Sequence, residues 1–372
     1  MGSKVVIRVD ASIKIGIGHV MRCLTLAEAL KSNGAEVSFI CRAHKGHLIE
    51  QIEQKGFFVF RLLLNPSTEL LNNGEVTDSN VATTDLTYAA WLGATQQEDA
   101  FECQVFLKEY APRWLIVDHY AIDRIWQSAL TKSNQKLMVI DDLANRKHLC
   151  DVLLDQTYGR AVQDYQSLVP KACHSLLGAE YALLAPSFSQ WRAFSLQHRD
   201  APSFKQLLIT MGGVDQSNVT GQILDFLNTL SLPNTLQITV VLGATAPHLT
   251  QVQRQAKTMR YQTQVLVSVD NMAEIMANSD FAIGAAGATT WERCSLGLPS
   301  MVMMLANNQQ QIMKVLSEQK IALVFDKDAL PKALSDLVHL SKNQLKQLSL
   351  NASNVLDGLG CERVVKILLD LT

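Results

Sequence analysis

Two series of short apolar runs, each run followed by a segment of helical periodicity, limit the folds open to this chain of 372 residues. In the first series, runs rich in branched apolar residues predict strands at Val5–Val9, Glu36–Cys41, Phe57–Leu64, Trp114–Asp118, Leu137–Asp141 and Val152–Asp155. Apolar residues spaced three and four apart predict helices at Met21–Ser32, His47–Gln54 and Ile122–Thr131. Strands that alternate with helices indicate a parallel sheet with right-handed crossovers.

The second series begins near Lys205. It predicts strands at Gln206–Met211, Gln237–Leu242, Val265–Ser268, Phe281–Gly284, Ser300–Leu305 and Ala322–Phe325, and helices at Asn218–Leu230 and Met272–Asn278. We place the connection between the series at Ala185–Phe204, which contains two prolines. The pattern therefore predicts an α/β protein with two Rossmann-like, doubly wound domains facing a cleft, over residues 1–190 and 200–372. It leaves open whether the last helix, about Glu362–Leu371, packs on the N-terminal domain.

A polar excursion from Asn65 to about Thr87 interrupts the first series. It is rich in Asn, Thr, Ser and Asp, which is typical of a surface loop. Tyr88, Trp91 and Phe101 follow it, and we expect these aromatic residues to pack its far end on the body of the domain.

Composition narrows the range of partners. The net charge of −2 provides no basic excess with which to neutralise nucleic-acid phosphates. Seven scattered cysteines without a C-x-x-C pair disfavour a disulfide framework or a zinc site and favour reduced thiols. No apolar run approaches the roughly 18 residues that a membrane span requires, and the N-terminus lacks the apolar stretch of a signal peptide. We therefore expect a cytoplasmic protein without nucleic-acid, membrane or metal partners, and favour a monomer.

Ligands bind open parallel sheets at the loops that follow the strands, so these loops carry the candidate sites. The first runs from Asp10 to His19 and contains Gly16 and Gly18, which let a ligand approach the backbone. A neutral His19 at the start of a helix is suited to act as a general base, although a capping or phosphate-contacting role stays open. The stretch Gly16-Ile-Gly-His-Val-Met21 lacks the third glycine of the dinucleotide fingerprint, so NAD binding is poorly supported.

Two further polar clusters follow strands of the first series. Asp118-His119-Tyr120 directs polar side chains toward the predicted cleft, with a strand-end cap as the alternative. Asp141-Asp142 resembles a carboxylate pair, but neighbouring residues at a strand end tend to point apart. Because no matching His or Asp cluster accompanies them, we expect a structural role for this pair and no metal.

Three loops of the second series favour a nucleotide-sugar ligand. The glycines of Met211-Gly-Gly-Val-Asp215 suit either a diphosphate cradle or a tight turn. Small residues in Gly284–Glu292 leave room for a flat ring or a phosphate. Glu292 can accept hydrogen bonds from both ribose hydroxyls or simply complement the helix dipole. The amides of Leu305–Gln310 suit sugar hydroxyls and N-acetyl groups, or a helix cap.

Together these loops resemble the UDP-sugar hydrolases of pseudaminic acid biosynthesis, which act on UDP-2,4-diacetamido-2,4,6-trideoxy-β-L-altropyranose. Those enzymes are relatives of the N-acetylglucosaminyl transferase that makes the peptidoglycan lipid precursor, and have the two-domain plan called GT-B. The resemblance covers nearly the whole chain and is carried by Arg8-Val-Asp10-Ala-Ser12, Gly16-Ile-Gly-His-Val-Met-Arg22-Cys-Leu-Thr-Leu-Ala27, Val117-Asp-His-Tyr120, Leu154-Asp-Gln156, Tyr165-Gln-Ser-Leu-Val-Pro170, Tyr181-Ala-Leu-Leu184, Met211-Gly-Gly-Val-Asp215 and Asn308-Gln309.

The resemblance implies attack of water at the anomeric carbon with inversion, release of UDP, and no cofactor. By position it implies that His19 activates the water, that Tyr120 and Asn308 contact the substrate near the reacting centre, and that Glu292 holds the ribose. Substrate contacts are also expected from Asp10, Gly16, Gly18, Arg22 and Gln309, and UDP contacts from Gly212, Gly213, Ala286, Gly287 and Thr289.

The chain departs from the family pattern after Tyr181-Ala-Leu-Leu184. Ala185-Pro186-Ser187 stands where the family often has Arg followed by Pro-Glu, so any substrate contact from that arginine is absent. Two alternatives to a hydrolase stay open: a UDP-sugar-dependent glycosyltransferase, and a non-catalytic nucleotide-sugar binding module. Dependence of turnover on His19 distinguishes an enzyme from a binding module.

Overall fold

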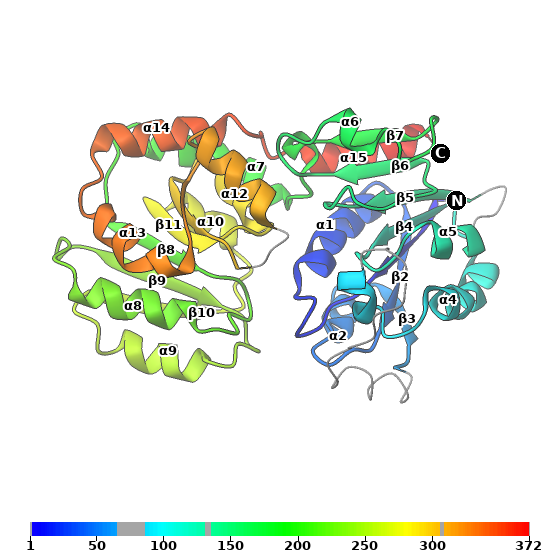
Figure 1. The fold of residues 1–372 in the computed structure, drawn as a ribbon, viewed down its shortest axis with the longest axis horizontal. Helices are drawn as coiled ribbons and strands as arrows, with labels where there is room; N and C mark the ends of the chain where they lie inside the picture. The colour runs from blue at the N-terminus through cyan, green and yellow to red at the C-terminus, as the bar shows by residue number, and fades with distance from the viewer. Residues whose placement is uncertain (1, 65–85, 131–134, 306–308, 372) are drawn as a thin grey trace. The chain divides into compact units, whose positions relative to one another are not determined.

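A computed structural model describes residues 2–64, 86–130, 135–305 and 309–371. The chain forms two compact units (Figure 1). The first comprises Met1–Leu183 together with Cys361–Thr372, and the second comprises Leu184–Gly360. Each unit is built on its own parallel sheet.

The first unit contains a seven-stranded parallel sheet in the order β3-β2-β1-β4-β5-β6-β7. The strands are β1 (Lys4–Val9), β2 (Glu36–Arg42), β3 (Phe58–Leu62), β4 (Trp114–Asp118), β5 (Lys136–Ile140), β6 (Val152–Asp155) and β7 (His174–Leu177). Strand order reverses between β1 and β4, which are hydrogen-bonded neighbours with Val9 opposite Asp118. In open parallel sheets, the point where strand order reverses is where ligands bind, outside the carboxyl ends of the strands.

Helices cover both faces of this sheet. They are α1 (Gly18–Ser32), α2 (Ile49–Gln54), α4 (Gln96–Tyr110), α5 (Arg124–Leu130), α6 (Val162–Tyr165) and α15 (Gly360–Asp370), with 3₁₀ turns at η2 (Leu86–Trp91) and η3 (Ala179–Tyr181). Alternate residues of β1 show why: Val5, Ile7 and Val9 belong to the core under α1, α2 and α15, whereas Val6 belongs to the core under α4 and α5. Strands buried on both faces read as continuous apolar runs, as the sequence does.

The second unit contains a six-stranded parallel sheet in the order β10-β9-β8-β11-β12-β13. Its strands are β8 (Gln206–Thr210), β9 (Gln237–Leu242), β10 (Gln262–Val267), β11 (Phe281–Ala285), β12 (Ser300–Met303) and β13 (Leu323–Phe325). Its helices are α7 (Pro186–His198), α8 (Val219–Thr229), α9 (Leu249–Ala256), α10 (Met272–Ala277), α11 (Thr289–Ser295), α12 (Gln310–Glu318), α13 (Leu330–Leu337) and α14 (Lys342–Ser353), with a 3₁₀ turn η5 (Lys327–Ala329). Here the order reverses between β8 and β11.

The prediction of two parallel α/β units is confirmed, but details of the chain path differ. The stretch 185–204, predicted as a connection, holds helix α7, whose first residue Pro186 is at a position where helices tolerate proline. Helix α4 and strand β7 were not predicted. The polar excursion at residues 65–85 lies outside the described residues.

Helix α15 belongs to the first unit (Figure 1). Val364, Val365 and Leu368 are buried in the core beneath α1, and the Arg363 guanidinium donates to the Glu180 carbonyl oxygen at 2.9 Å. The units 1–183 and 184–360 thus replace the predicted boundaries at 190 and 200, with the last helix returning to the first unit.

Candidate functional site

The loop after β1 is a tight turn that delivers the chain into α1. The Ser12 hydroxyl accepts hydrogen bonds from the Lys14 and Ile15 amides at 3.1 and 2.9 Å, and the Gly16 amide donates to the Ser12 carbonyl at 2.8 Å. Gly16 has a φ of 80°, a region that favours glycine. Gly18 has no such φ, and no described atom lies within 4 Å of where its Cβ would stand. Neither conformation nor crowding within the described protein therefore explains Gly18.

His19, the second residue of α1, is held by a carboxylate from the neighbouring switch strand. Its Nδ1 lies 2.6 Å from Asp118 Oδ1, at the end of β4. A carboxylate accepts the Nδ1 proton, so the neutral ring presents a basic Nε2. Helix α1 has no side-chain cap and no acidic residue in its first turn.

Asp118 is clamped by Arg22, one turn further along α1. Arg22 Nε donates to Asp118 Oδ2 at 2.6 Å and Nη2 donates to Oδ1 at 2.7 Å, a bidentate pair. Burial by itself would raise the pKa of Asp118, but Arg22 and then His19 hold that pKa well below its ordinary value. Asp118 therefore stays ionised at neutral pH and keeps its hydrogen bond with the imidazole.

The same arginine links this pair to a second carboxylate and a phenol. Arg22 Nη1 donates to Asp142 Oδ2 at 2.7 Å, and the Tyr120 hydroxyl donates to the same oxygen at 2.9 Å. Burial, followed by the Asp142 charge, raises the pKa of Tyr120 well above its ordinary value, so the phenol stays protonated. Since its one proton is given to Asp142, the Tyr120 oxygen can only accept hydrogen bonds from a ligand.

Aromatic rings extend from His19 along this edge. The Tyr120 ring meets the His19 ring edge-on at 4.6 Å, and the Trp91 ring stacks on Tyr120 at 5.9 Å. Tyr88 contacts both Tyr120 and Trp91, at 5.2 and 4.6 Å. Tyr88 and Trp91 thus pack on the body of the unit, as expected. The same prediction is wrong for Phe101, because its side chain is 72% exposed.

Asp10 and Arg22, both expected to touch the substrate, have protein groups as hydrogen-bond partners in the described structure. Asp10 is fully buried; its Oδ1 accepts from Arg8 Nη1 at 2.6 Å and from the Arg42 amide at 2.7 Å, and its Oδ2 lies 3.3 Å from His119 Nε2. Burial would raise the pKa of Asp10, but Arg8 holds it well below its ordinary value. The Nε, Nη1 and Nη2 atoms of Arg22 donate hydrogen bonds to Asp118 and Asp142. Both residues support the site from beneath.

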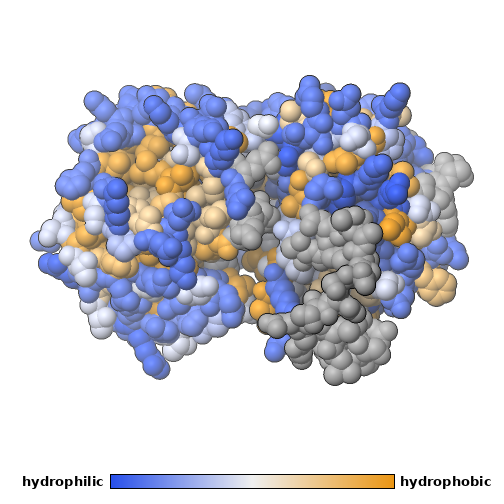
Figure 2. All heavy atoms as spheres, in the orientation of Figure 1, coloured by the Kyte–Doolittle hydropathy of each residue, from blue (hydrophilic) through white to orange (hydrophobic). Residues whose placement is uncertain are grey.

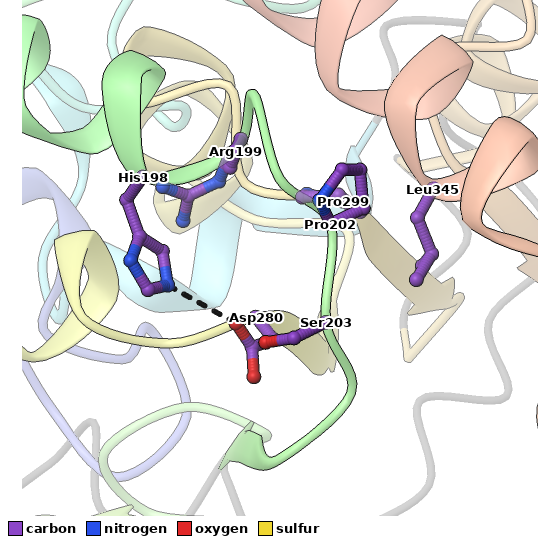
Figure 3. A pocket seen from close by; sticks show the side chains of 7 residues that line it. All are labelled: His198, Arg199, Pro202, Ser203, Asp280, Pro299 and Leu345. Atoms are coloured by element: carbon purple, nitrogen blue, oxygen red, sulfur yellow. Dashed lines mark hydrogen bonds and ion pairs between the residues drawn. The ribbon is translucent and has the colours of Figure 1, made fainter.

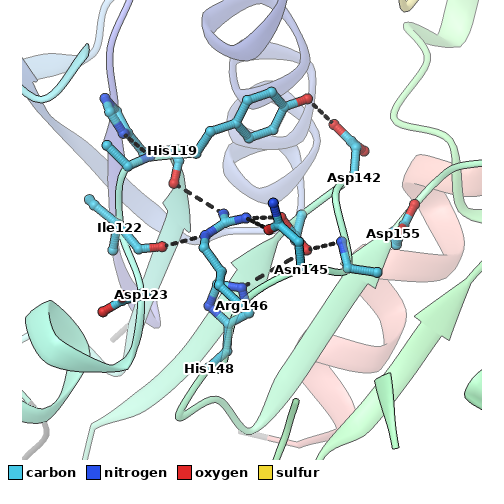
Figure 4. A network of polar contacts seen from close by, with 12 residues as sticks. His119, Ile122, Asp123, Asp142, Asn145, Arg146, His148 and Asp155 are labelled. Atoms are coloured by element: carbon cyan, nitrogen blue, oxygen red, sulfur yellow. Dashed lines mark hydrogen bonds and ion pairs between the residues drawn. The ribbon is translucent and has the colours of Figure 1, made fainter. Parts of the chain in front are cut away.

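Asp141 and Asp142 have different partners, as neighbouring strand-end residues tend to have; Figure 4 shows Asp142 and the polar contacts around Arg146. Asp141 is fully buried; Arg146 Nη1 lies 2.7 Å from its Oδ1 and the Tyr165 hydroxyl donates to its Oδ2 at 2.7 Å. Arg146 also donates to the Ile122 carbonyl at 2.9 Å. Both residues bind protein groups, in keeping with the structural role predicted for the pair; the partners of Asp142 are Arg22 and Tyr120.

In the second unit, the loop after β8 is shaped by two glycines and an aspartate. Gly212 has a φ of 102°, and the Gly213 carbonyl accepts the Gly243 amide at 2.8 Å. Asp215 accepts the Val219 and Thr220 amides at 2.9 and 2.8 Å, so it caps helix α8. Because the first amides of α8 are already bonded to protein, any diphosphate here would meet the glycine backbone rather than the end of that helix.

The loop after β11 lies beside it, because β8 and β11 are paired with Thr210 opposite Gly284. Ala286 continues toward β12, its amide donating to the Met303 carbonyl at 3.1 Å. Gly287 has no described atom within 4 Å of its Cβ position, like Gly18. Thr289 is partly engaged, since its hydroxyl accepts Arg293 Nη1 at 3.2 Å.

Glu292 projects from α11 with an unusual electrostatic environment. Within the described part of the chain its carboxylate accepts no hydrogen bond, and the side chain is half-buried. Burial, partly offset by Arg293, raises the pKa of Glu292 to about 7. An unpartnered carboxylate of this kind is available to a ligand that donates hydrogen bonds.

The amide cluster after β12 is only partly described. Asn308 lies outside the described residues. Gln309 precedes α12, and its Oε1 accepts the Leu305 amide at 2.8 Å. The amide oxygen of Gln309 therefore closes its own turn, as a helix cap does.

Elsewhere in the second unit a shallow hollow is lined by His198, Arg199, Pro202, Ser203, Asp280, Pro299 and Leu345 (Figure 3). Asp280 there accepts the Lys205 and Gln206 amides at 2.7 and 2.9 Å and lies 3.1 Å from His198 Nε2. These contacts tie α7 to the sheet. None of the predicted site residues lines this hollow, and we assign it no ligand.

Across the described residues, no helix is both long and apolar enough to span a membrane. On the face drawn in Figure 2, hydrophilic residues cover much of the surface, and hydrophobic residues gather over part of the second unit.

The sequence indicated Asp118 and Asp142 only as members of polar clusters and did not predict their contacts. Asp118 ends β4 and Asp142 follows β5, but nothing local indicates that one contacts His19 and the other joins Arg22 to Tyr120. Asp118 is 99 residues from His19, and Asp142 is 120 residues from Arg22. The usable signal was topological: β1 and β4 flank the reversal of strand order, so the residues at their ends had to meet.

Comparisons with known proteins agree with this architecture. Residues 206–358 match the model of the glycosyltransferase family 28 C-terminal domain. The chain is 27% identical over 309 residues to the UDP-2,4-diacetamido-2,4,6-trideoxy-beta-L-altropyranose hydrolase of Campylobacter jejuni, covering 82% of this chain and 93% of that protein. It is 22% identical over 378 residues to the spore coat polysaccharide biosynthesis protein SpsG of Bacillus subtilis, covering 97% and 96% of the two chains.

Among solved structures, MurG of Acinetobacter baumannii superposes with a TM-score of 0.68 at 15% identity, with 99% of each chain covered. This likeness shows the fold. The chain therefore has a GT-B fold whose residues 206–358 correspond to a glycosyltransferase family 28 C-terminal domain, and it resembles the UDP-2,4-diacetamido-2,4,6-trideoxy-β-L-altropyranose hydrolases as its sequence motifs predicted.

Proposed function

We propose that this protein hydrolyses a UDP-2,4-diacetamido-2,4,6-trideoxyhexose at the anomeric C1–O bond, with inversion, and releases UDP and the free sugar. The observation that carries the proposal is the 2.6 Å contact between His19 Nδ1 and Asp118 Oδ1, at the point where strand order reverses. Resemblance to the Campylobacter jejuni hydrolase supplies the substrate class. The free sugar would then serve nonulosonic (pseudaminic) acid synthesis in the cytoplasm.

In the proposed reaction His19 removes a proton from water. Asp118 holds the Nδ1 proton, so Nε2 takes the proton from the water as its oxygen attacks C1. The bond between C1 and the diphosphate oxygen breaks, its electron pair stays on that oxygen, and UDP leaves. Arg22 keeps Asp118 ionised, and the resulting carboxylate stabilises the imidazolium that forms.

The proposed substrate contacts come from residues around His19. Gly18 leaves room for the sugar to approach the start of α1. The Tyr120 oxygen accepts a hydrogen bond from an acetamido N–H, and the Tyr88 and Trp91 rings offer apolar surface to the deoxy and acetyl methyl groups. We assign the UDP to the second unit, with its diphosphate at Gly212, Gly213, Ala286, Gly287 and Thr289 and its ribose at Glu292.

Release of UDP without an acceptor tests the proposal. Purified protein is incubated with the UDP-sugar in water enriched in ¹⁸O, and UDP and sugar are followed by chromatography, mass spectrometry and NMR. We expect stoichiometric UDP and sugar, ¹⁸O at C1 of the sugar and none in UDP, and initial formation of the inverted anomer. The proposal is refuted if no UDP forms from the altro, gluco or other 2,4-diacetamido isomers.

A glycosyltransferase is the second candidate, favoured by the family 28 domain and the GT-B fold. It requires the same UDP-sugar but transfers the sugar to a hydroxyl of an acceptor. The same incubation separates the two, because a transferase releases UDP at an appreciable rate only after an acceptor is added.

Asp118→Asn is expected to lower kcat by about 10²–10⁴-fold, with a smaller change in KM. The amide lacks the charge that stabilises the imidazolium, and its NH₂ can donate to Nδ1 and so move the ring proton to Nε2. Steady-state kinetics on folded protein checks this. Asp142→Asn is the matched control, because it leaves the His19–Asp118 contact intact and should cost less than Asp118→Asn. Equal losses in the two variants would contradict the role of Asp118.

Glu292 should make UDP binding depend on pH. Its pKa of about 7 means that the carboxylate ionises as pH rises through 7, and only the ionised form accepts both ribose hydroxyls. We expect UDP affinity to be roughly tenfold lower at pH 6 than at pH 8, because about a tenth of the carboxylate is ionised at pH 6 and about nine-tenths at pH 8.

Calorimetric titration at both pH values measures this effect. The terminal phosphate of UDP itself titrates near pH 6. The quantity to read is therefore the ratio of affinities of wild type and Glu292→Gln, which cancels the ligand's titration. A ratio that stays constant from pH 6 to pH 8 would exclude Glu292 from ribose binding.

A further inference from the structure

We propose that Cys150 and Cys173 form an oxidation site in the first unit, at which Cys173 reacts with peroxides or small disulfides and Cys150 then closes an intramolecular disulfide. The two sulfur atoms lie 3.6 Å apart. They are not bonded, since all seven cysteines are free thiols. The site lies outside the cluster around His19.

Strand pairing explains why these thiols meet. Cys150 lies two residues before Val152, the first residue of β6, and Cys173 lies one residue before His174, the first residue of β7. The two strands are parallel neighbours with Val152 opposite His174. The His174 amide donates to the Asp151 carbonyl at 2.8 Å, so the two strands are joined at the residues that directly follow the two cysteines. Their approach is therefore part of the sheet register.

The two thiols have unequal chemistry. Cys173 is half-exposed, whereas Cys150 is 5% exposed. The hydrogen bond between the two thiols lowers the pKa of Cys173 below its ordinary value and, together with burial, raises the pKa of Cys150. An accessible thiolate beside a buried thiol is the usual arrangement of an attacking and a resolving cysteine.

The other five cysteines supply an internal control. Cys23, Cys41, Cys103, Cys294 and Cys361 are all buried. Burial raises the pKa of each of these thiols. Reaction with an electrophile in the folded protein is therefore expected at Cys173 first.

The chemistry balances with a peroxide as the oxidant. The Cys173 thiolate attacks one peroxide oxygen, the O–O bond breaks, and a sulfenic acid and hydroxide form. The Cys150 sulfur then attacks the Cys173 sulfur, the S–O bond breaks, and water leaves with the Cys150 proton. Two thiols lose two electrons in all, and hydrogen peroxide is reduced to two waters. A dithiol reductant reduces the disulfide back to the two thiols.

The disulfide would close a loop that lies against the candidate site. It encloses Asp155, Arg160 and Tyr165, and the Arg160 guanidinium donates to the Asp142 carbonyl at 2.8 Å. Restricting this loop in the unfolded chain stabilises the fold. We expect oxidation to raise Tm by several degrees, on the order of 5 °C, reversibly.

Mass mapping of the full-length, folded protein tests the proposal. Brief treatment with iodoacetamide under reducing conditions should alkylate Cys173 at least about tenfold faster than any other cysteine. A few equivalents of hydrogen peroxide, followed by alkylation of remaining thiols and proteolysis without reductant, should yield a Cys150–Cys173 linked peptide. Cys150→Ala should instead leave Cys173 as a sulfenic acid that dimedone captures.

Two results would overturn the proposal: alkylation of Cys173 no faster than of the buried cysteines, or oxidation that joins Cys173 to a second copy of the chain instead of Cys150. Both readouts come from wild-type protein, so they hold even if a variant folds poorly. Neither depends on UDP release, so failure of the hydrolase proposal leaves this one unaffected.

Discussion

Replacing His19 with alanine is expected to lower kcat for UDP release by about 10³-fold while leaving the Kd for UDP within about twofold of wild type. The proposed reaction needs a base at the water, and in the described structure His19 is placed for that role by Asp118 at 2.6 Å. UDP is assigned to the second unit, so removal of an imidazole in the first unit should leave its binding intact. Initial rates and calorimetric titration of UDP measure the two quantities separately.

His47→Ala is the matched control. His47 is a partly exposed histidine of the same unit, 3.3 Å from Glu50, and among the described residues it has no hydrogen bond or ion pair with Asp118, Arg22, Tyr120 or Asp142. It should retain full activity. Full activity of His19→Ala would refute the assignment of His19 as the base and would favour a water activated elsewhere. A parallel loss of UDP affinity would place the nucleotide against α1 and contradict our division of the ligand between the units.

Replacing Asp99 with alanine is expected to lower the free energy of unfolding of the first unit by about 3–5 kcal/mol. Asp99 lies on α4 and is fully buried, where it accepts Arg8 Nη2 at 2.7 Å, Arg42 Nη2 at 2.8 Å and Trp126 Nε1 at 2.8 Å. Arg8 and Arg42 are themselves wholly buried. Without the carboxylate, two guanidinium groups would share the remaining acidic partners in a medium that solvates charge poorly.

Urea-induced unfolding followed by tryptophan fluorescence measures this loss. Glu102→Ala serves as the control, since Glu102 contacts Arg42 at 2.7 Å from a side chain that is 43% exposed. Arg42 keeps its buried partner Asp99 in this variant, and the lost partner is partly exposed to water, so we expect a smaller loss of stability than in Asp99→Ala. An Asp99→Ala variant as stable as Glu102→Ala would show that water reaches the buried arginines.

Elements whose signal lies within their own sequence were predictable. Apolar strands such as Trp114–Asp118 need no partner to be recognised, and Asn33-Gly34 ends α1 with Gly34 at a φ of 85°. Helix α4 was missed because its buried face includes Asp99, a charged residue whose partner Arg8 is 91 residues away. Helix α7 was missed because Pro186 suggested a linker, although proline is also favoured in the first turn of a helix.

The candidate site divides in the same way. The position of His19 at the start of a helix could be predicted from glycine spacing and periodicity. Whether a polar residue faces a ligand or the protein could not. Asp10 and Arg22 stand in loop and helix positions that suit substrate binding. In the described structure, however, Asp10 is hydrogen-bonded to Arg8, and Arg22 to Asp118 and Asp142. Buried polar groups require partners, and those partners come from distant strands.

The return of α15 to the first unit makes the second unit an insertion in the chain. On the ribosome, Lys4–Leu183 would emerge first but could not finish its core, because Val364, Val365 and Leu368 fill it and are synthesised after all of Leu184–Gly360. The second unit is one continuous segment, so it needs no later residues to complete its core and can fold as soon as it has emerged. During synthesis the apolar residues of the first unit that pack against α15 would therefore stay uncovered until a whole further domain has been made, and that interval is when a chaperone or a premature stop would matter most.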